Sequence, residues 1–362
     1  MPPDHNQLFA AARKPRVCIT GANGFIGSHV ADAFAKAGIP LLCQLRPGSS
    51  NTNLIEGGHD HQLLYSHLDT PGAIDFLTHA FCGLECVIHI AGRSCDWGSY
   101  RQFESGNVLA TRNVCEAVLR AGVRRLILTG SISSYGEEHH PEPKNEDDAY
   151  APRQHYPLGG LFPSAMNHYR ETKAEASRWA VEFAHQYGLQ LTLLEPVWIF
   201  GERESSSGFL EYLDVARILP VVPGCRANIF PVLYVLDLAR AFLHVFREQP
   251  QGVEKFIVGS RQQRTMQEVY TAFCLAADIR PPLLLPRLPC MISGILLEIL
   301  WTLLRRRNPP PISRSRVNML FDSIPFSAEK FHQTFGPFPE TPFEESVRNT
   351  IAWYHQNRSS HQ

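Results

Sequence analysis

Short apolar runs alternate with segments of helical spacing along the first 200 residues of the chain. The helical segments include SHVADAFAKAG (28–38) and NVCEAVLRAGV (113–123), whose apolar residues recur at helical intervals. Strand-like runs without polar alternation, each followed by a helix, predict an α/β fold with a doubly wound parallel sheet covered on both faces. The predicted strands are RVCIT (16–20), LLCQL (41–45), HQLLY (61–65), CVIHIA (86–91), RLILTG (125–130) and LQLTLLEP (189–196).

The pattern becomes irregular beyond residue 200. YVLDLARAFLHVF (234–246) predicts a strand end that runs into a helix, KFIVG (255–259) predicts one more strand, and the segment 263–356 has mostly helical spacing interrupted by prolines. We expect a first domain made of 15–200 plus 230–260, and a smaller, mostly helical substrate-binding domain made of 201–229 plus 261–356. Residues 1–14 are expected to form a disordered tail.

One segment near the C-terminus is unusually apolar. PCMISGILLEILWTLLRRR (289–307) is apolar for about four turns and ends in three arginines. It is shorter than the ~20 apolar residues that a membrane-spanning helix needs, and Glu298 interrupts it. We expect a buried helix of the substrate-binding domain at 289–304, with peripheral membrane contact or contact with a second copy as the alternatives.

The charge balance excludes some classes of partner. The chain has 34 Lys and Arg against 35 Asp and Glu, a net charge of −1, so we expect no general attraction to nucleic acid. The nine cysteines are scattered, and no second pair or histidine set completes a zinc site, so no metal is expected. Because the N-terminus also lacks the apolar region of a signal peptide, we expect a cytoplasmic location.

A glycine-rich turn connects the first predicted strand to the first predicted helix. TGANGFIGSHV places Gly21, Gly24 and Gly27 between them. Glycine allows the tight turn and the close approach of the backbone to a pyrophosphate, and the N-terminus of the helix offers free N–H groups to the phosphates. Strand before and helix after are the context that this motif requires, so the sequence predicts a Rossmann-type dinucleotide site.

The end of the second strand bears on the choice of cofactor. It reads QLRPGSS (44–50), with Arg46 and without the carboxylate that would bind the ribose hydroxyls of NAD. Arg46 can pair with the 2′-phosphate of NADP, and Ser49 and Ser50 can add hydrogen bonds. The alternative is a solvated surface arginine. The sequence therefore favours NADP over NAD.

YRETK (169–173) places a phenol and an ammonium group on one face of a helix. The pKa of a free tyrosine is ≈ 10, and a nearby ammonium stabilises the phenolate and brings that pKa closer to neutrality. Tyr169 and Lys173 are therefore a candidate acid/base and its activator. A third group would be a hydroxyl at the end of another strand, where Thr129, Ser131, Ser133 and Ser134 are available, although such residues are also common in turns.

Several motifs of the chain, in the order in which they occur, resemble those of the extended short-chain dehydrogenase/reductase superfamily, in particular its NAD-dependent epimerase/dehydratase-like members. The resemblance covers nearly the whole chain. It implies that Tyr169 is the general acid/base, that Lys173 activates it and anchors the ribose, and that Ser131, or failing it Ser133, orients the substrate oxygen. Asn107 either supports this region, as the family asparagine does, or caps a helix. The matching segments are TGANGFIG, CVIHIAG, NVLATRNVCEAVLRAGVRRLILTGS, YRETK, LEPVWIFG and YVLDLARAF.

The same resemblance implies the cofactor-binding residues. Two places depart from the family pattern: SHLD has His67 and Leu68 where an Asp-hydrophobic pair usually holds adenine, and Glu195 precedes Pro196 where arginine is usual. Tyr169 follows Ser131 by 38 positions, more than usual, so 136–168 is expected to form a lid or insertion over the pocket. The implied cofactor-binding residues are Gly21, Gly24, Phe25, Ile26, Gly27, Arg46, His67, Leu68, Ala91, Tyr169, Lys173, Pro196 and Val197.

Three functions remain open within this resemblance. The C-terminal half is similar to the 3β-hydroxysteroid dehydrogenase and dihydroflavonol reductase-like branch, which implies an NAD(P)-dependent oxidoreductase acting on an apolar steroid-like, lipid-like or aromatic alcohol or ketone. Trp97 either packs on that substrate or lies in the core. A nucleotide-sugar epimerase is the second function, with Arg226 as the candidate phosphate contact, and a catalytically silent cofactor-binding protein is the third. Family members often form homodimers.

Overall fold

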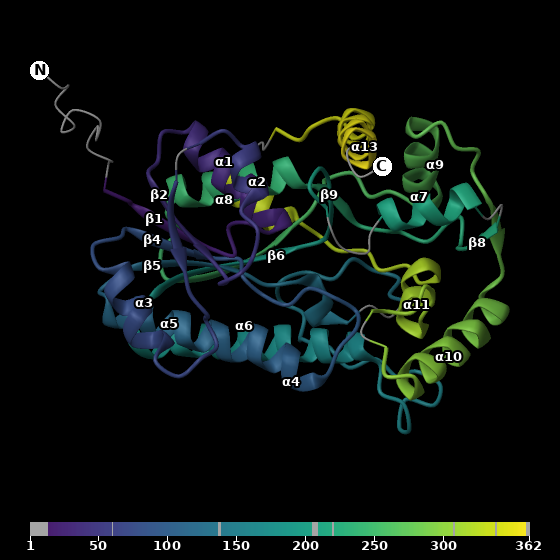
Figure 1. Cartoon of the computed structure of the whole chain (residues 1–362), viewed down its shortest axis with the longest axis horizontal. Helices are drawn as coiled ribbons and strands as arrows, with labels where there is room; N and C mark the ends of the chain where they lie inside the picture. Colours follow the sequence, from purple (N-terminus) through teal and green to yellow (C-terminus); the bar gives the residue numbers. More distant parts are fainter. Residues whose placement is uncertain are drawn as a thin grey trace, which may run out of the picture.

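A computed structural model describes residues 14–59, 61–136, 139–204, 209–218, 221–306, 308–336 and 339–359. Apart from Lys14, the predicted N-terminal tail lies outside the described residues. A seven-stranded parallel sheet forms the centre of the molecule, with the strand order β10-β6-β5-β4-β1-β2-β3 (Figure 1). Its strands are β1 (Val17–Thr20), β2 (Leu41–Leu45), β3 (Gln62–Tyr65), β4 (Cys86–His89), β5 (Arg125–Thr129), β6 (Gln190–Pro196) and β10 (Val253–Val258).

Helices cover both faces of this sheet, which confirms the predicted doubly wound architecture. β1 and β4 are buried at every position, as their lack of polar alternation predicts. Figure 1 shows α1, α2 and α8 above the sheet and α3, α5 and α6 below it, and each layer packs on its own apolar cluster. These helices are α1 (Phe25–Lys36), α2 (Thr52–Glu56), α3 (Ala73–Phe81), α5 (Ala110–Arg120), α6 (Ala165–Tyr187) and α8 (Val235–Glu248).

The remaining elements lie mostly at one end of the sheet (Figure 1). Two small parallel sheets pair β7 (Trp198–Phe200) with β9 (Val232–Tyr234) and β8 (Val221–Pro223) with β11 (Leu283–Leu285). The predicted division into two domains stays a prediction. The other helices are α4 (Tyr100–Phe103), the π-helix η2 (Glu104–Leu109), the 3-10 helix η3 (Ile132–Tyr135), α7 (Phe209–Ile218), α9 (Met266–Ala276), α10 (Arg287–Leu303), α11 (Arg314–Phe321), α12 (Glu329–Phe335) and α13 (Phe343–Ser359).

Local sequence sets several of the helix ends. Gly188 ends α6 in the left-handed conformation, with φ 67° and ψ 27°, which glycine adopts without steric cost. At the start of α9, the backbone N–H of Glu268 donates to the hydroxyl of Thr265, and the N–H of Thr265 donates to the Glu268 carboxylate. This reciprocal pair satisfies two donors that the first turn leaves free.

The prediction of a buried helix at 289–304 is wrong. The side of α10 that faces the protein carries Cys290, Gly294 and Glu298, whereas most of its leucines are exposed. Glu298 forms a buried ion pair with Arg314, and its carboxylate also accepts the backbone N–H of Arg314 at 2.7 Å. A helix that must present a carboxylate inward turns its apolar side chains outward, because the two stripes lie on opposite faces.

Arg314 also joins α10 and α11 to the insertion 136–168. Its guanidinium donates to the carbonyl oxygens of Pro157 and Phe162, each at 2.6 Å. The described residues 139–164 form no helix or strand, apart from an isolated bridge between Lys144 and Phe326. The insertion is therefore held by long-range polar contacts and not by regular structure of its own.

Replacing Arg314 by methionine should lower the free energy of unfolding by about 3 kcal/mol, because it leaves the Glu298 carboxylate buried without its cation. The substitution Arg120→Met breaks an exposed pair with Glu116 and should change the free energy of unfolding by less than about 1 kcal/mol. Urea denaturation of both variants measures the difference. Equal losses would show that Arg314 does not hold the α10 region in place.

Candidate active site

A cavity of about 920 Å³ opens at the carboxyl ends of the central strands. It lies where the strand order reverses, between β1 and β4, which is where ligands bind in open α/β sheets. All the residues implied as cofactor-binding or catalytic line this one cavity, together with Ser133 and Asn107. The structure therefore brings the predicted residues together, although their individual roles stay predictions.

The glycine turn has the geometry that its sequence predicts. Gly21 has φ 66°, and a Cβ atom there would lie 2.8 Å from the Cα atom of Ala91. A Cβ atom on Gly27 would lie 2.2 Å from the carbonyl oxygen of Gly21. Side chains are thus excluded at both positions, and the N-terminus of α1 begins at the cavity wall. This cradle fits the diphosphate of a dinucleotide.

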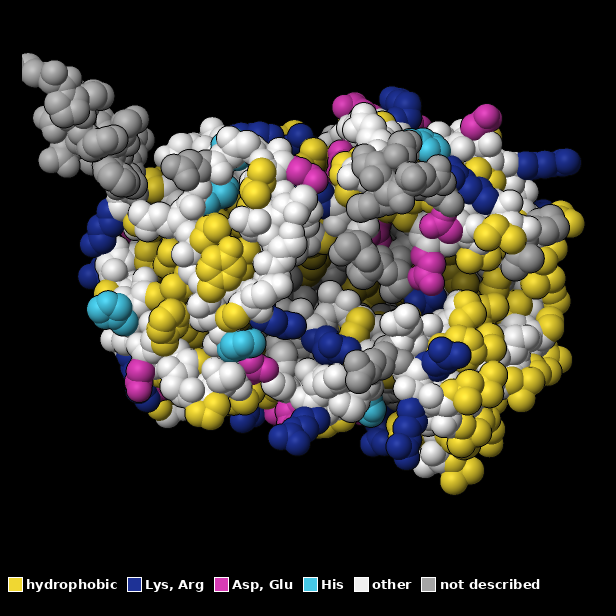
Figure 2. Space-filling model, in the orientation of Figure 1, with side chains coloured by type: hydrophobic (Ala, Val, Ile, Leu, Met, Phe, Trp, Pro, Cys, Tyr) yellow, Lys and Arg dark blue, Asp and Glu magenta, His cyan; other side chains and the backbone are white. Residues whose placement is uncertain are grey.

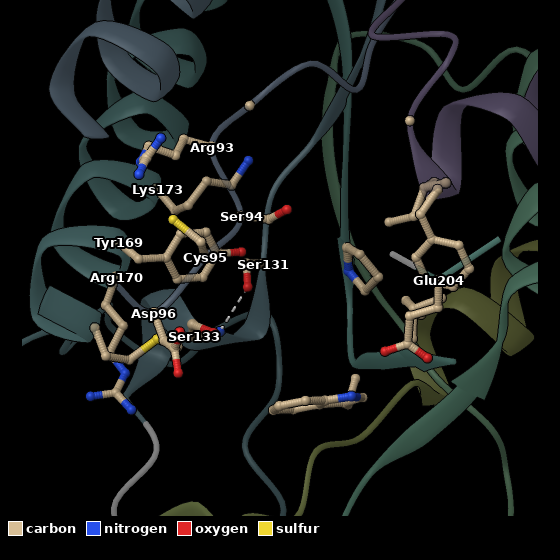
Figure 3. A pocket seen from close by; sticks show the side chains of 18 of the residues that line it. Arg93, Ser94, Cys95, Asp96, Ser131, Ser133, Tyr169, Arg170, Lys173 and Glu204 are labelled. Carbon is tan, nitrogen blue, oxygen red and sulfur yellow. Dashed lines mark hydrogen bonds between the residues drawn. The ribbon is translucent and has the colours of Figure 1, made fainter. Parts of the chain in front are cut away.

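Tyr169, Lys173 and Ser131 lie side by side on one wall of the cavity, and Glu204 lies across from them (Figure 3). Tyr169 and Lys173 come from α6, as the helical spacing predicts. The Tyr169 ring packs against Phe103 at 6.5 Å between ring centroids. Ser131 follows β5, and its hydroxyl accepts the backbone N–H of Ser133 at 3.2 Å, which fixes its direction.

The ammonium group of Lys173 is buried. It donates to the carbonyl oxygen of Thr129 at 2.6 Å, at the end of β5. Burial lowers the pKa of Lys173 to about 8, and the negative charge of Glu195 acts in the opposite direction. The group therefore combines a short fixed hydrogen bond with a positive charge next to Tyr169, the arrangement that the sequence predicts for activation of the phenol.

Asn107 is not a helix cap. It lies inside the π-helix η2, where its amide oxygen accepts the backbone N–H of Arg93 at 2.7 Å and its amide nitrogen donates to the hydroxyl of Thr172 at 3.1 Å. Thr172 precedes Lys173 on α6. Asn107 thus ties the loop after β4 to the helix of the candidate catalytic residues, which is the supporting position that the resemblance implies.

A buried carboxyl group with two phenol partners lies behind Lys173 and could not be predicted from local sequence. The hydroxyls of Tyr135 and Tyr150 donate to the two oxygens of Glu195 at 2.6 and 2.5 Å. Burial raises the pKa of Glu195 to about 7, although both hydrogen bonds lower it. Glu195 stands at the position where the family usually has arginine. Its side chain packs against Gly130, and its two partners are phenols.

The far end of the cavity also contains ionisable residues that the sequence does not predict. Arg316 of α11 pairs with Asp96 at 2.6 Å and with Glu211 at 3.1 Å. Glu204 is buried, one of its carboxylate oxygens has no hydrogen-bond partner, and burial raises its pKa to about 8. These residues lie far apart in the sequence, so no short motif signals them.

Some predicted residues lie elsewhere. Arg226 is exposed and does not line the cavity, and Ser134 is buried behind it. Trp97 neither lines the cavity nor lies in the core; its ring N–H donates to the carbonyl oxygen of Arg306 at 3.0 Å. None of the described residues 139–165 lines the cavity, so the lid is not seen in the part of the insertion that the structure describes.

The residues next to the predicted adenine and ribose contacts are polar. Arg46 is exposed at the cavity rim with no ion-pair partner among the residues that the structure describes, and Ser49 donates to its carbonyl oxygen at 2.6 Å. Ser50 does not line the cavity. Asp69, which follows His67 and Leu68, also lines it and was not singled out by the sequence analysis.

Comparison with known proteins gives a consistent picture. The model of the NAD dependent epimerase/dehydratase family matches residues 17–259. The chain is 25% identical to 2-alkyl-3-oxoalkanoate reductase of Stenotrophomonas maltophilia (strain K279a), over 93% of this chain and 98% of that protein. It is 24% identical to 3beta-hydroxysteroid-dehydrogenase/decarboxylase isoform 2 of Arabidopsis thaliana, over 94% of this chain and 62% of that protein.

A solved structure shows the same fold. MoeE5 in complex with UDP-glucose and NAD superimposes with a TM-score of 0.70 at 21% identity, over 94% of this chain and 99% of that chain. This likeness extends to the C-terminal elements beyond the segment that the family model matches. At this identity it supports the fold and leaves the substrate open.

Replacing Glu195 by glutamine should change how stability depends on pH. The native carboxyl keeps its proton up to about pH 7, whereas its ordinary pKa is 4.5, so its contribution to the free energy of unfolding falls as the pH rises from 4.5 to 7. The slope of that fall is at most about 1.4 kcal/mol per pH unit. Urea denaturation between these pH values should give a flatter curve for Glu195→Gln. Parallel curves for the variant and the original chain would show that the Glu195 carboxyl of the folded protein is not protonated in this pH range.

Proposed function

Because the chain belongs to the NAD dependent epimerase/dehydratase family, we propose that it is an NAD(P)-dependent oxidoreductase that interconverts a ketone and a secondary alcohol on an apolar small molecule. The observation that carries this proposal is the convergence of Tyr169, Lys173 and Ser131 on the cavity that also contains the glycine turn. Dehydrogenases, reductases and epimerases of this family share an NAD-dependent site, and the further properties of the cavity favour the reductase.

The cradle made by Gly21, Gly24 and Gly27 would hold the diphosphate, with Ala91, Pro196 and Val197 along the path toward Tyr169. When bound, the cofactor supplies or accepts the hydride that the protein itself cannot provide. The chain's own residues then need to place the substrate carbon and manage one proton.

Tyr169 gives its hydroxyl proton to the substrate oxygen when a ketone is reduced, and takes that proton back when the alcohol is oxidised. In the reducing direction the substrate carbon gains a hydride and the oxygen gains a proton, which balances the conversion of a ketone to an alcohol. Lys173 stabilises the phenolate that remains, and the Ser131 hydroxyl donates to the substrate oxygen and fixes its position.

The substrate end of the cavity supports an apolar substrate. Cationic side chains there already have protein partners, which limits their ability to neutralise a sugar-nucleotide diphosphate: Arg316 binds Asp96 and Glu211, and Arg93 donates to the carbonyl oxygen of Trp97. The similarity to a 2-alkyl-3-oxoalkanoate reductase over nearly the full length of both chains supports the same class. The apolar side chains that line this end are Tyr212, Val215, Val222, Phe230, Tyr270, Met319, Leu320 and Ile324.

Replacing Tyr169 by phenylalanine should lower kcat by roughly 10²–10⁴-fold, since the proton donor is lost while cofactor binding remains. The matched control is Tyr187→Phe, an exposed tyrosine at the other end of the same helix, which should leave kcat unchanged. Consumption of NADPH or NADH with β-keto acid, steroid and aromatic ketones measures turnover, and cofactor fluorescence measures binding.

Two results would contradict the proposal. Epimerisation of a sugar nucleotide without net consumption of cofactor would assign the chain to the epimerases. Unchanged turnover in Tyr169→Phe would show that another group transfers the proton.

Replacing Arg46 by alanine should raise the KM for NADPH by about tenfold or more, because it removes the cation expected to pair with the 2′-phosphate. The KM for NADH should change much less, because NADH lacks that phosphate. Steady-state kinetics with both cofactors measures the two values. If the original chain prefers NADH and the variant behaves identically, Arg46 is a solvated surface residue and the preference for NADP is wrong.

A further inference from the structure

An apolar patch lies on the outer face of α10 and β11. We define it as eight residues, all large and apolar, which are eight of the 19 such side chains that are strongly exposed in the described part of the chain. Figure 2 shows a broad hydrophobic area at the end of the molecule where Figure 1 places α10. The patch consists of Leu283, Leu285, Leu288, Ile292, Leu296, Leu300, Leu303 and Leu304, exposed by 71%, 36%, 71%, 50%, 62%, 44%, 71% and 55%.

The fold holds this patch outward. Four of the exposed positions on α10, from Leu288 to Leu300, are spaced four residues apart, so they form one stripe along the helix. On the opposite side, a Cβ atom on Gly294 would lie 3.1 Å from the backbone of Ser313, and Glu298 is fixed by Arg314. Rotation of α10 to bury the leucines would expel that carboxylate from its cation, so the outward face is built in. Contiguous apolar surface of this kind marks an interaction site.

The charges around the patch identify its partner. Residues 278–306 contain four exposed arginines, Arg280, Arg287, Arg305 and Arg306, against one exposed acidic residue, Asp278, since Glu298 is buried and paired. Arg287 also binds Asp322, which leaves three exposed cations without a recorded ion pair in this segment. Cations that border an apolar face complement an anionic lipid surface, where the leucines enter the acyl boundary and the arginines contact headgroup phosphates.

A second copy of the chain fits this surface less well. A two-fold interface pairs each patch with itself, so antiparallel α10 helices would place Arg305 and Arg306 of one copy near Arg280 and Arg287 of the other. Like charges brought together across an interface oppose association. Among the described residues no helix is long and apolar enough to cross a membrane, which leaves contact along the surface as the geometry available to α10.

We propose that the α10–β11 patch docks the protein on an anionic lipid surface. Leu285 belongs to the patch and also lines the cavity, and its strand pairs with β8, whose residues Val221, Val222 and Pro223 line the cavity as well. The apolar end of the cavity thus adjoins the docking face. This step rests on the proposed function: a lipid-like substrate passes from the lipid layer into the cavity along β8 and β11.

Flotation of the full-length protein with vesicles tests the docking. Wild-type protein should bind vesicles of phosphatidylcholine with phosphatidylserine, and bind vesicles of phosphatidylcholine alone at least about tenfold more weakly. The triple variant Ile292→Gln/Leu296→Gln/Leu300→Gln should lose about tenfold or more of the binding. Arg305→Glu/Arg306→Glu should lower binding to the anionic vesicles by at least roughly 30-fold, since two attractive charges are lost and two repulsive ones are added. The control Ile55→Gln/Leu63→Gln/Phe76→Gln, exposed on α2, β3 and α3 and outside the patch, should bind like wild type.

Further measurements separate the outcomes. Circular dichroism should show that all variants keep the fold, since each substituted side chain is exposed. Turnover of a water-soluble ketone should be the same in the triple variant and in wild type, so failure to dock and failure of the proposed function are read independently. Wild-type protein that stays unbound at low salt would overturn the proposal. So would a dimer, seen by sedimentation, that the triple substitution dissociates while vesicle binding is unaffected.

Discussion

Burial of the Lys173 ammonium group constrains the whole wall of the cavity. A desolvated charge is costly unless polar groups surround it. Here the Thr129 carbonyl oxygen accepts a hydrogen bond from the ammonium group, and Glu195 adds a negative charge from behind once its carboxyl ionises, near pH 7. That carbonyl is available only because β5 ends where α6 passes over it. Asn107 holds α6 in this position through Thr172, so three elements distant in sequence meet around one amino group.

Local sequence is enough to predict the strands, the glycine turn and the placement of Tyr169 and Lys173 on one helix face, because each of these features depends on residues a few positions apart. Gly21 and Gly27 are informative for this reason: the turn excludes side chains wherever it occurs. The apolar run at 289–304 was misread since its orientation depends on Arg314, which lies 16 residues from Glu298 and more than 150 residues from the carbonyl groups that it also binds. A charged residue within an apolar run can therefore mark the inner face of a helix and not an interruption.

The acidic residues in and behind the cavity wall show the same limit. In the sequence Glu195 differs from the family pattern, but nothing near it indicates its two phenol partners, which are 60 and 45 residues away. Asp96 and Arg316 are 220 residues apart, and only the fold reveals that they pair. Trp97, next to Asp96 in the sequence, donates instead to the carbonyl oxygen of Arg306, three residues after the end of α10. Two neighbouring residues of one loop therefore contact different parts of the molecule.

The π-helical turn η2 lies between α4 and α5 and interrupts the regular spacing of residues around the helix axis. A π turn accommodates one residue more than an α turn, so α4 and α5 form one rod whose two halves are out of phase. Phe103 faces the Tyr169 ring from one phase, and Asn107 reaches Thr172 from within the extra turn. Loss of one residue here would let the rod close into a regular helix without any break in the chain. The defect would then appear as a rotation of Asn107 away from its partners, a change that leaves helix content almost intact and disturbs only the cavity wall that carries Tyr169 and Lys173.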